Sequence, residues 1–272
     1  MTIELRAGSA SCTIAPLDGG RISSLRVDDR EILVPRLAEH PPMFGGSFPM
    51  VPWAGRIRDG RFSFDGNHYQ LELGLPPHAI HGTVYTAPWR VGTVGNDFAE
   101  LSCPTGSSWP FGGMVRQRFE LTSDEIRCTL SITADEQAMP AQVGWHPWFP
   151  KPHSADVAFA SMFERDEHGI PNGLMIAVPT GPVDDCFIEP QGPLRLHYDD
   201  LTIEIASDCD HWVVFSALED VFCIEPQSGA PNAVNGPVSQ RIEPGQTLER
   251  WMTIGWQPLL HVHETLVPDT DR

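Results

Sequence analysis

Apolar and polar residues alternate through most of this sequence, and short turn segments separate the alternating runs. In the stretch RFSFDGNHYQLEL, Phe62 and Phe64 fall on one face of an extended chain, and Tyr69 and Leu71 do the same in the segment that follows. Residues 65–67 between them (DGN) are of the types that tight hairpin turns prefer. Because side chains of a strand point alternately to its two faces, this pattern predicts a β-hairpin with one buried face.

Three further segments repeat the pattern: RQRFELTSDEIRCTLSI at 116–132, LRLHYDDLTIEIAS at 194–207 and WVVFSALEDVFCIEP at 212–226. No stretch longer than about ten residues shows the 3.6-residue apolar period that a helical or α/β chain of this length would show several times. The 26 prolines and 24 glycines indicate many loops, and 41% hydrophobic residues suffice for a sizeable core. The sequence therefore predicts an all-β fold, a large antiparallel β-sandwich, in a single domain over residues 1–272.

The charge balance restricts the partners of this chain. Its 36 acidic residues against 18 basic ones give a formal net charge of −18. We therefore expect neither nucleic acid nor an anionic membrane as a partner, because both are bound through lysine and arginine. The single lysine, Lys151, is the one candidate for chemistry through a Schiff base. A neutral small molecule is the partner that this composition favours.

The cysteines and the hydropathy pattern indicate a compartment. None of the six cysteines forms a CxxC pair, and several lie inside apolar strand patterns such as IRCTLSI, so we expect them to be reduced and buried. The first residues, MTIELRAGSA, lack the charged and apolar segments of a secretion signal. No apolar run approaches the ~18 residues that a membrane helix needs. The expected location is the cytoplasm.

The stretch VGWHPWFP places one histidine among aromatic residues. Trp145, Trp148 and Phe149 supply a large apolar surface, and His146 is the type of side chain whose charge changes most readily near neutral pH. Pro147 restricts the residue before it to extended backbone, so we expect His146 at the end of a strand. The stretch is compatible with a wall for a ring-shaped, weakly polar ligand and equally with an aromatic corner of the core.

Four other segments place polar groups beside aromatic residues and tight turns. Glu225 ends the apolar run VFCI just before a proline, where a carboxylate is costly to bury without a partner. His81 precedes a glycine in HAIHGTVY, Arg56 lies in GRIRDGRF, and Asp184 and Asp185 follow Gly-Pro-Val. Taken one at a time, these residues also fit ordinary structural roles at a strand end, in turns or in solvent.

Taken together, the order and wording of these segments resemble the aldose 1-epimerase (galactose mutarotase) family. The matching features, in chain order, are GGRISSL, GRIRDGRFSFDGNHYQL, IHG, HPWF, DDCF, EPQSGAPNA and PGQTLERWMTIGW, and they cover nearly the whole chain. Short pieces such as HG are common, whereas HPWF followed by the EPQ segment is specific. The resemblance implies the galactose mutarotase-like supersandwich and mutarotation of a sugar, with no metal and no organic cofactor.

The resemblance also implies roles for individual residues: His146 is the general acid and Glu225 is the general base. The implied sugar-binding residues are Arg56, His81, Asp184 and Trp148, with Asp185 as the alternative to Asp184. Three positions depart from the family pattern: Gly55 and Pro150 stand in place of asparagines and Trp148 in place of a tyrosine. The acid and base are kept while sugar-positioning groups differ, so a preference for galactose does not follow.

The residues leave alternatives open. A hexose-6-phosphate 1-epimerase would use Arg56, Arg58 and Arg61 as a phosphate site. A non-catalytic carbohydrate-binding protein would keep the pocket without turnover. A metal enzyme would take its ligands from His78, His81, His146 and Glu225. Because the net charge of −18 repels a dianionic sugar phosphate, we expect an aldose 1-epimerase for an unphosphorylated aldose, acting as a monomer or homodimer.

Overall fold

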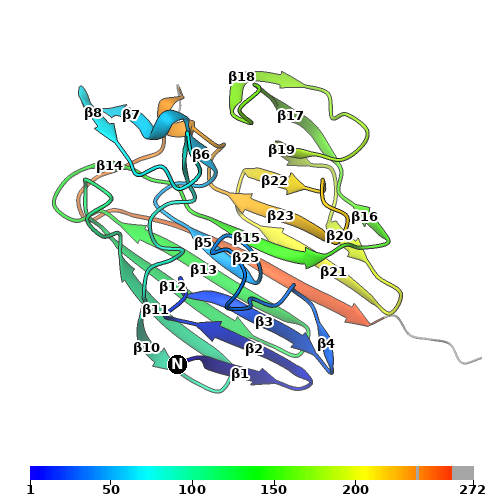
Figure 1. The fold of residues 1–272 in the computed structure, drawn as a ribbon. Coiled ribbons are helices and arrows are strands. Elements are labelled where there is room, and N and C mark those ends of the chain that lie inside the picture. Colours follow the sequence, from blue (N-terminus) through cyan, green and yellow to red (C-terminus); the bar gives the residue numbers. More distant parts are fainter. Residues whose placement is uncertain (237–238, 259–272) are drawn as a thin grey trace, which may run out of the picture.

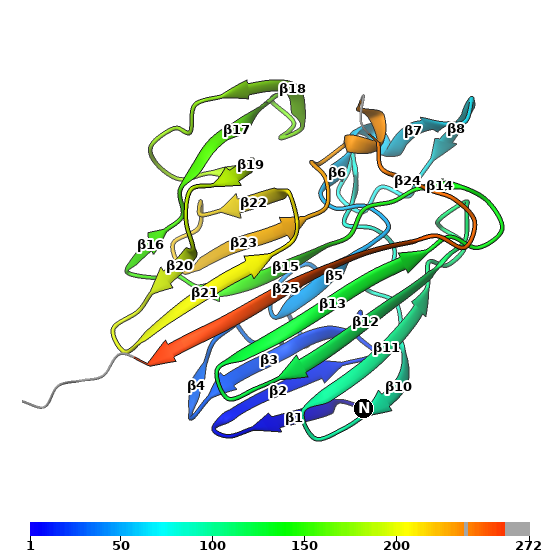
Figure 2. The same cartoon turned by 180° about the vertical axis from the view of Figure 1, so that it is seen from behind.

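Two antiparallel β-sheets packed face to face form most of the molecule (Figure 1, Figure 2). The computed structural model describes residues 1–236 and 239–258. Within these ranges the helical segments are two single 3-10 turns, η1 (Arg58–Gly60) and η2 (Ala233–Asn235). The prediction of an all-β, antiparallel sandwich is confirmed. The last part of the predicted 1–272 domain, residues 259–272, lies outside the described residues.

The larger sheet has eleven strands, and the second sheet has eight. In spatial order the strands of the larger sheet are β1 (Ile3–Ala7), β2 (Ala10–Ala15), β3 (Arg21–Val27), β5 (Ser47–Met50), β15 (Gly144–Pro150), β23 (Val221–Gln227), β22 (His211–Phe215), β19 (Asp184–Pro190), β17 (Phe159–Arg165) and β18 (Pro171–Ile176), with β4 (Arg30–Glu31) paired to β3. Those of the second sheet are β10 (Arg90–Val94), β11 (Phe98–Pro104), β12 (Met114–Leu121), β13 (Glu125–Thr133), β25 (Thr247–Pro258), β21 (Leu201–Ser207), β20 (Leu194–His197) and β16 (Ser154–Asp156). Three two-stranded ribbons join β14 (Met139–Pro140) to β24 (Arg241–Ile242), β6 (Arg56–Ile57) to β9 (Ala79–Ile80) and β7 (Arg61–Phe64) to β8 (Asn67–Gln70).

The four hairpins expected from the alternating runs are all present, as β7–β8, β12–β13, β20–β21 and β22–β23. In the first, Phe62 lies opposite Tyr69, and their rings stack with centroids 5.1 Å apart. In the turn between β12 and β13, the Glu125 backbone N–H donates to the hydroxyl of Thr122 at 3.1 Å. Local turn chemistry and cross-strand packing therefore set the same register.

One apolar core fills the space between the two large sheets. Its members from both sheets include Leu5, Ile14, Leu25, Phe119, Leu130 and Ile254, each at most 1% exposed. All six cysteines are free and buried, as expected. In the part of the chain that the structure describes, no helix is long and apolar enough to cross a bilayer.

A second, smaller apolar cluster lies on the other face of the larger sheet. It contains Phe48, Met50, Trp148 and Cys223, all from the adjoining strands β5, β15 and β23. The middle of this sheet is therefore covered on both faces, which explains why β15 and β23 are buried along nearly their whole length. The outer face of these central strands carries the candidate site.

Candidate active site

The period of two along β15 divides the motif WHPWF between two environments. Trp145 and Phe149 belong to the core between the sheets, whereas Trp148 belongs to the outer cluster. His146 shares the outer face with Trp148 because the two residues are two positions apart. Both alternatives for the motif therefore hold in part: half of it is core, and half lines a cavity.

His146 lies in the middle of β15 and not at a strand end, so that expectation was wrong, although the backbone is extended as expected. The ladder between β15 and β23 pairs Gly144 with Gln227 and resumes with Trp148 opposite Cys223. Between these pairs each strand carries a proline, which has no N–H to donate. The strand thus continues through Pro147 because pairing with β23 is interrupted there, while β5 pairs on the other side.

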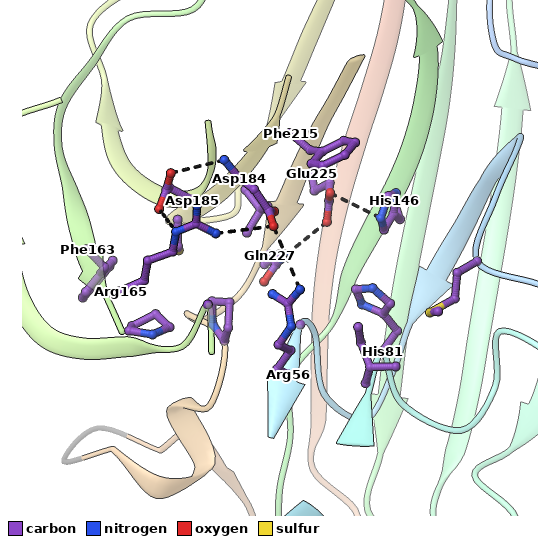
Figure 3. A pocket seen from close by; sticks show the side chains of 18 of the residues that line it. Arg56, His81, His146, Phe163, Arg165, Asp184, Asp185, Phe215, Glu225 and Gln227 are labelled. Atoms are coloured by element: carbon purple, nitrogen blue, oxygen red, sulfur yellow. Dashed lines mark hydrogen bonds and ion pairs between the residues drawn. The ribbon is translucent and has the colours of Figure 1, made fainter. Parts of the chain in front are cut away.

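Glu225 faces His146 from β23. Both residues lie between the two ladder pairs, on neighbouring strands, and His146 Nε2 is 3.4 Å from Glu225 Oε1 (Figure 3). Their side chains are only 9% and 4% exposed. The imidazole stacks on the rings of Phe48 and Trp148, with ring centroids 4.7 and 4.9 Å away. The aromatic rings thereby fix the plane in which the histidine nitrogens point.

Burial shifts the pKa values of this pair in opposite directions. It lowers the pKa of His146 to about 3. It also raises the pKa of Glu225 well above its usual range, and the neighbouring Asp184 carboxylate adds to this effect, while Arg56 and Gln227 oppose it. Desolvation penalises the charged form of each group, which accounts for both directions. Both shifts favour the uncharged form of each group.

His81 approaches the pair from the loop after β9. Its ring lies edge-on to that of His146 with centroids 5.2 Å apart. Burial, followed by His146 and Arg56, lowers its pKa well below the usual range. The backbone is left-handed at His81, with φ 57°, a conformation that costs energy for a residue other than glycine. Gly82 follows with φ 79°, and a Cβ there would lie 1.9 Å from the Val51 carbonyl oxygen, so the IHG motif requires its glycine.

Two arginines and two aspartates form the side of the cavity opposite His146 (Figure 3). Arg56 Nη2 and Arg165 Nη1 lie 4.0 and 3.5 Å from Asp184 Oδ2, and Arg165 Nε lies 2.8 Å from Asp185 Oδ1. Asp184 begins β19 between the arginines, while Asp185 is 7% exposed and engaged by Arg165. Arg165, on β17, was missed because FERD contains no recognisable motif, and only the fold brings it to Asp184.

The cavity bounded by these side chains has a volume of about 300 Å³, in the range of small-molecule sites. All six predicted site residues line it, as does the alternative Asp185. Five buried polar atoms of its wall lack a hydrogen-bond partner within residues 1–236 and 239–258. They are His81 Nδ1, His146 Nδ1, Trp148 Nε1, Gln227 Oε1 and Asp185 Oδ1, of which the last is in an ion pair with Arg165. Buried polar groups normally find partners, so this wall is suited to a ligand rich in hydroxyl groups.

The structure does not bring together all the residues that the phosphate-site alternative and the metal-enzyme alternative need. Arg58 pairs with Asp166, and Arg61 donates to Gln70 at 3.0 Å, so of the three neighbouring arginines only Arg56 lines the cavity. Of the residues of the metal-enzyme alternative, His81, His146 and Glu225 line the cavity, but His78 does not. His78 accepts the Asp59 backbone N–H at its Nδ1, 3.1 Å away.

Comparison with known proteins relates this chain to a family. The sequence model of the aldose 1-epimerase family matches residues 1–255. The uncharacterised protein YphB of Escherichia coli (strain K12) is 27% identical over 267 residues, which cover 87% of this chain and 91% of YphB.

Two solved structures illustrate the likeness of fold. A galactose mutarotase-like protein from Clostridium acetobutylicum superposes with a TM-score of 0.83 at 18% identity, over 95% of both chains. Galactose 1-epimerase from Lactobacillus acidophilus NCFM gives 0.80 at 14% identity, over 94% of both chains. At identities this low, similarity to a solved structure establishes the fold alone. The family model matches residues 1–255, and the chain therefore belongs to the aldose 1-epimerase family.

Proposed function

We propose that this protein is an aldose 1-epimerase that interconverts the α and β anomers of an unphosphorylated aldose by acid/base-catalysed ring opening. The observation that carries the proposal is the His146–Glu225 pair, 3.4 Å apart, on the wall of a sugar-sized cavity. Membership of the family supports the class of reaction. The pair supplies the two proton-transfer groups that mutarotation needs.

In the proposed cycle, Glu225 removes the proton of the anomeric hydroxyl while His146 gives a proton to the ring oxygen. The C1–O5 bond breaks and C1 becomes an aldehyde carbon. Rotation about the C1–C2 bond presents the other face of the aldehyde to the ring hydroxyl. On closure the two residues exchange roles: His146 takes the proton of that hydroxyl, and Glu225 returns one to the carbonyl oxygen. Atoms and protons balance over the cycle, so no redox partner is needed.

The pair must hold one proton for this cycle. That proton resides on Glu225 before a sugar binds, because burial raises the pKa of Glu225 and lowers that of His146. The working form, with imidazolium and carboxylate, carries the same number of protons and differs only in where one of them sits. An imidazolium of low pKa is a strong acid, and a carboxylate of raised pKa is a strong base. Both shifts therefore favour proton transfer once the anomeric and ring oxygens of the sugar contact the two groups.

The other predicted residues would hold the sugar. The Trp148 ring offers an apolar surface for the C–H face of a pyranose. Arg56, His81 and Asp184 offer polar groups for its hydroxyls, and Arg165 would hold Asp184 in place.

The charges in the cavity favour a neutral substrate over a phosphate. Its two arginines, Arg56 and Arg165, already lie beside the carboxylates of Asp184 and Asp185. A sugar phosphate would have to displace an aspartate from an arginine, so the hexose-6-phosphate alternative loses support. We propose further that the protein acts in the cytoplasm, as a monomer or homodimer.

Polarimetry tests the proposal. Freshly dissolved α-D-glucose and α-D-galactose should reach anomeric equilibrium faster in proportion to enzyme concentration, and the His146→Asn variant should show only the buffer rate. Sugar binding by the wild-type protein without any acceleration would contradict the proposal and establish the non-catalytic alternative.

A further inference from the structure

One nucleophilic group beside the catalytic pair takes no part in the proposed cycle. Cys223 lies two residues before Glu225 on β23, so the two side chains share a face of the strand. One ring nitrogen of His146, the sulfur of Cys223 and a carboxylate oxygen of Glu225 lie within 4.8 Å of one another. All three residues are buried. From these three groups we infer a binding site for a thiophilic divalent cation, with Zn²⁺ as the best fit, whose occupation stops turnover.

The spacing of the donors suits tetrahedral coordination. With zinc–nitrogen and zinc–oxygen bonds of about 2.0–2.2 Å, two such ligands at a tetrahedral angle lie about 3.4 Å apart. The nitrogen and oxygen of His146 and Glu225 lie 3.4 Å apart. A sulfur at about 2.3 Å from the metal would lie about 3.6 Å from the nitrogen and from the oxygen. Because the three donor atoms already lie within 4.8 Å of one another, a small side-chain rotation suffices to reach these distances.

The chemical types and charges of the donors select the cation. Imidazole, thiolate and carboxylate together form a ligand set typical of zinc and unlike the all-oxygen sets of Mg²⁺ or Ca²⁺. A dipositive ion with one thiolate, one carboxylate and a neutral imidazole gives a centre with no net charge, which a buried position tolerates. His146 and Glu225 both line the cavity, so an ion can enter there, and its fourth position is left for water or a sugar hydroxyl.

Occupation of this site inhibits the proposed reaction. A metal bound to His146 and Glu225 uses the nitrogen and oxygen that would transfer protons, so neither group can act as acid or base. This inference rests on the proposed function for its kinetic consequence, but metal binding itself does not depend on that function. The ion expected here is therefore an inhibitor, unlike the ion of a metal-dependent enzyme built on His78 and His81.

The kinetic test compares variants in metal-free buffer and in micromolar zinc chloride. Zinc should lower kcat/KM of the wild-type protein by at least about tenfold, reversibly with EDTA, once its concentration exceeds the dissociation constant tenfold. Cys223→Ser and Cys223→Val should lose this sensitivity. Cys186→Ser is the matched control, because Cys186 is another buried cysteine of the same sheet face, on β19. It should stay zinc-sensitive, and zinc inhibition of both Cys223 variants to the wild-type extent would overturn the inference.

A spectroscopic arm separates this inference from the proposed function. Co²⁺ replaces Zn²⁺ in such sites, and thiolate ligation gives an intense charge-transfer band in the near ultraviolet. The wild-type and Cys186→Ser proteins should show this band at one equivalent of Co²⁺, and Cys223→Val should not. A cobalt complex of the wild-type protein without the band, or failure to bind cobalt, contradicts the metal site even if mutarotation is observed. The band in a protein without mutarotase activity supports the site and refutes only the proposed function.

Discussion

Replacing Glu225 by glutamine tests the candidate site most directly, because the change keeps the shape of the side chain and removes its basic group. A positioned general base contributes about 10²–10⁴-fold to the rate, so kcat should fall by that factor, equivalent to about 3–5 kcal/mol. Sugar binding should persist, since the cavity and its other polar groups are unchanged. Polarimetry gives the rate, and calorimetric titration with glucose gives the binding. Glu249→Gln, an exposed change on β25, is the control and should leave both unaffected.

The same substitution should make the protein more stable than the wild type at alkaline pH. Because burial raises the pKa of Glu225 above its ordinary value of 4.5, the folded state binds this proton more tightly than the unfolded state. Ionisation therefore reduces the stability of the wild type as pH rises from 4.5 to the raised pKa, by about 1.4 kcal/mol for each pH unit in that window. Glutamine has no proton to lose. Urea denaturation in EDTA should show similar stabilities at pH 4 and a more stable variant at pH 8.

Two results would refute this reasoning separately. A folded Glu225→Gln protein with a near wild-type polarimetric rate cannot have lost its general base, and the role assigned to Glu225 would be wrong. A variant that is less stable than the wild type at pH 8 would show that the carboxylate is well satisfied when ionised, which contradicts the upward pKa shift. The Glu249→Gln control excludes a general effect of removing one negative charge from this acidic chain.

The remaining predictions concern other parts of the site. His146→Asn should abolish turnover, since an amide cannot deliver a proton at neutral pH, whereas His78→Asn, outside the cavity, should change kcat/KM only mildly; the opposite order would show that the acid is misassigned. In a pH profile of kcat/KM, activity should fall as the pair loses its one proton at the raised pKa of Glu225. Asp184→Asn should move this alkaline limb to lower pH, because the Asp184 carboxylate helps to raise that pKa, while Asp185→Asn should leave it in place; equal shifts would deny Asp184 its special position. EDTA dialysis should preserve activity, and free glucose should be preferred over glucose 6-phosphate; a preference for the phosphate above about tenfold, worth ~1.4 kcal/mol, would favour the phosphate epimerase.

Much of the fold was contained in the sequence because its signals are local. The period-two pattern and the turns at residues 65–67 and 122–125 specify hairpins through neighbouring residues alone. The sequence could not give the order of the strands, because pairing such as that of β15 with β23 joins residues far apart in the chain. The interruption of the ladder at Pro147 was equally hidden, so His146 was expected at a strand end.

The site shows the same division. The resemblance of the sequence to a family named His146 as the acid and Glu225 as the base. Only the tertiary structure decided that the side chains of His146 on β15 and Glu225 on β23 lie on the same face of the sheet, 3.4 Å apart. It also decided that Arg165 contacts Asp184. It also decided the directions in which the pKa values of the pair shift. A pKa depends on how completely water is removed from a group, and that is fixed by sheets and loops that close around it from distant parts of the chain.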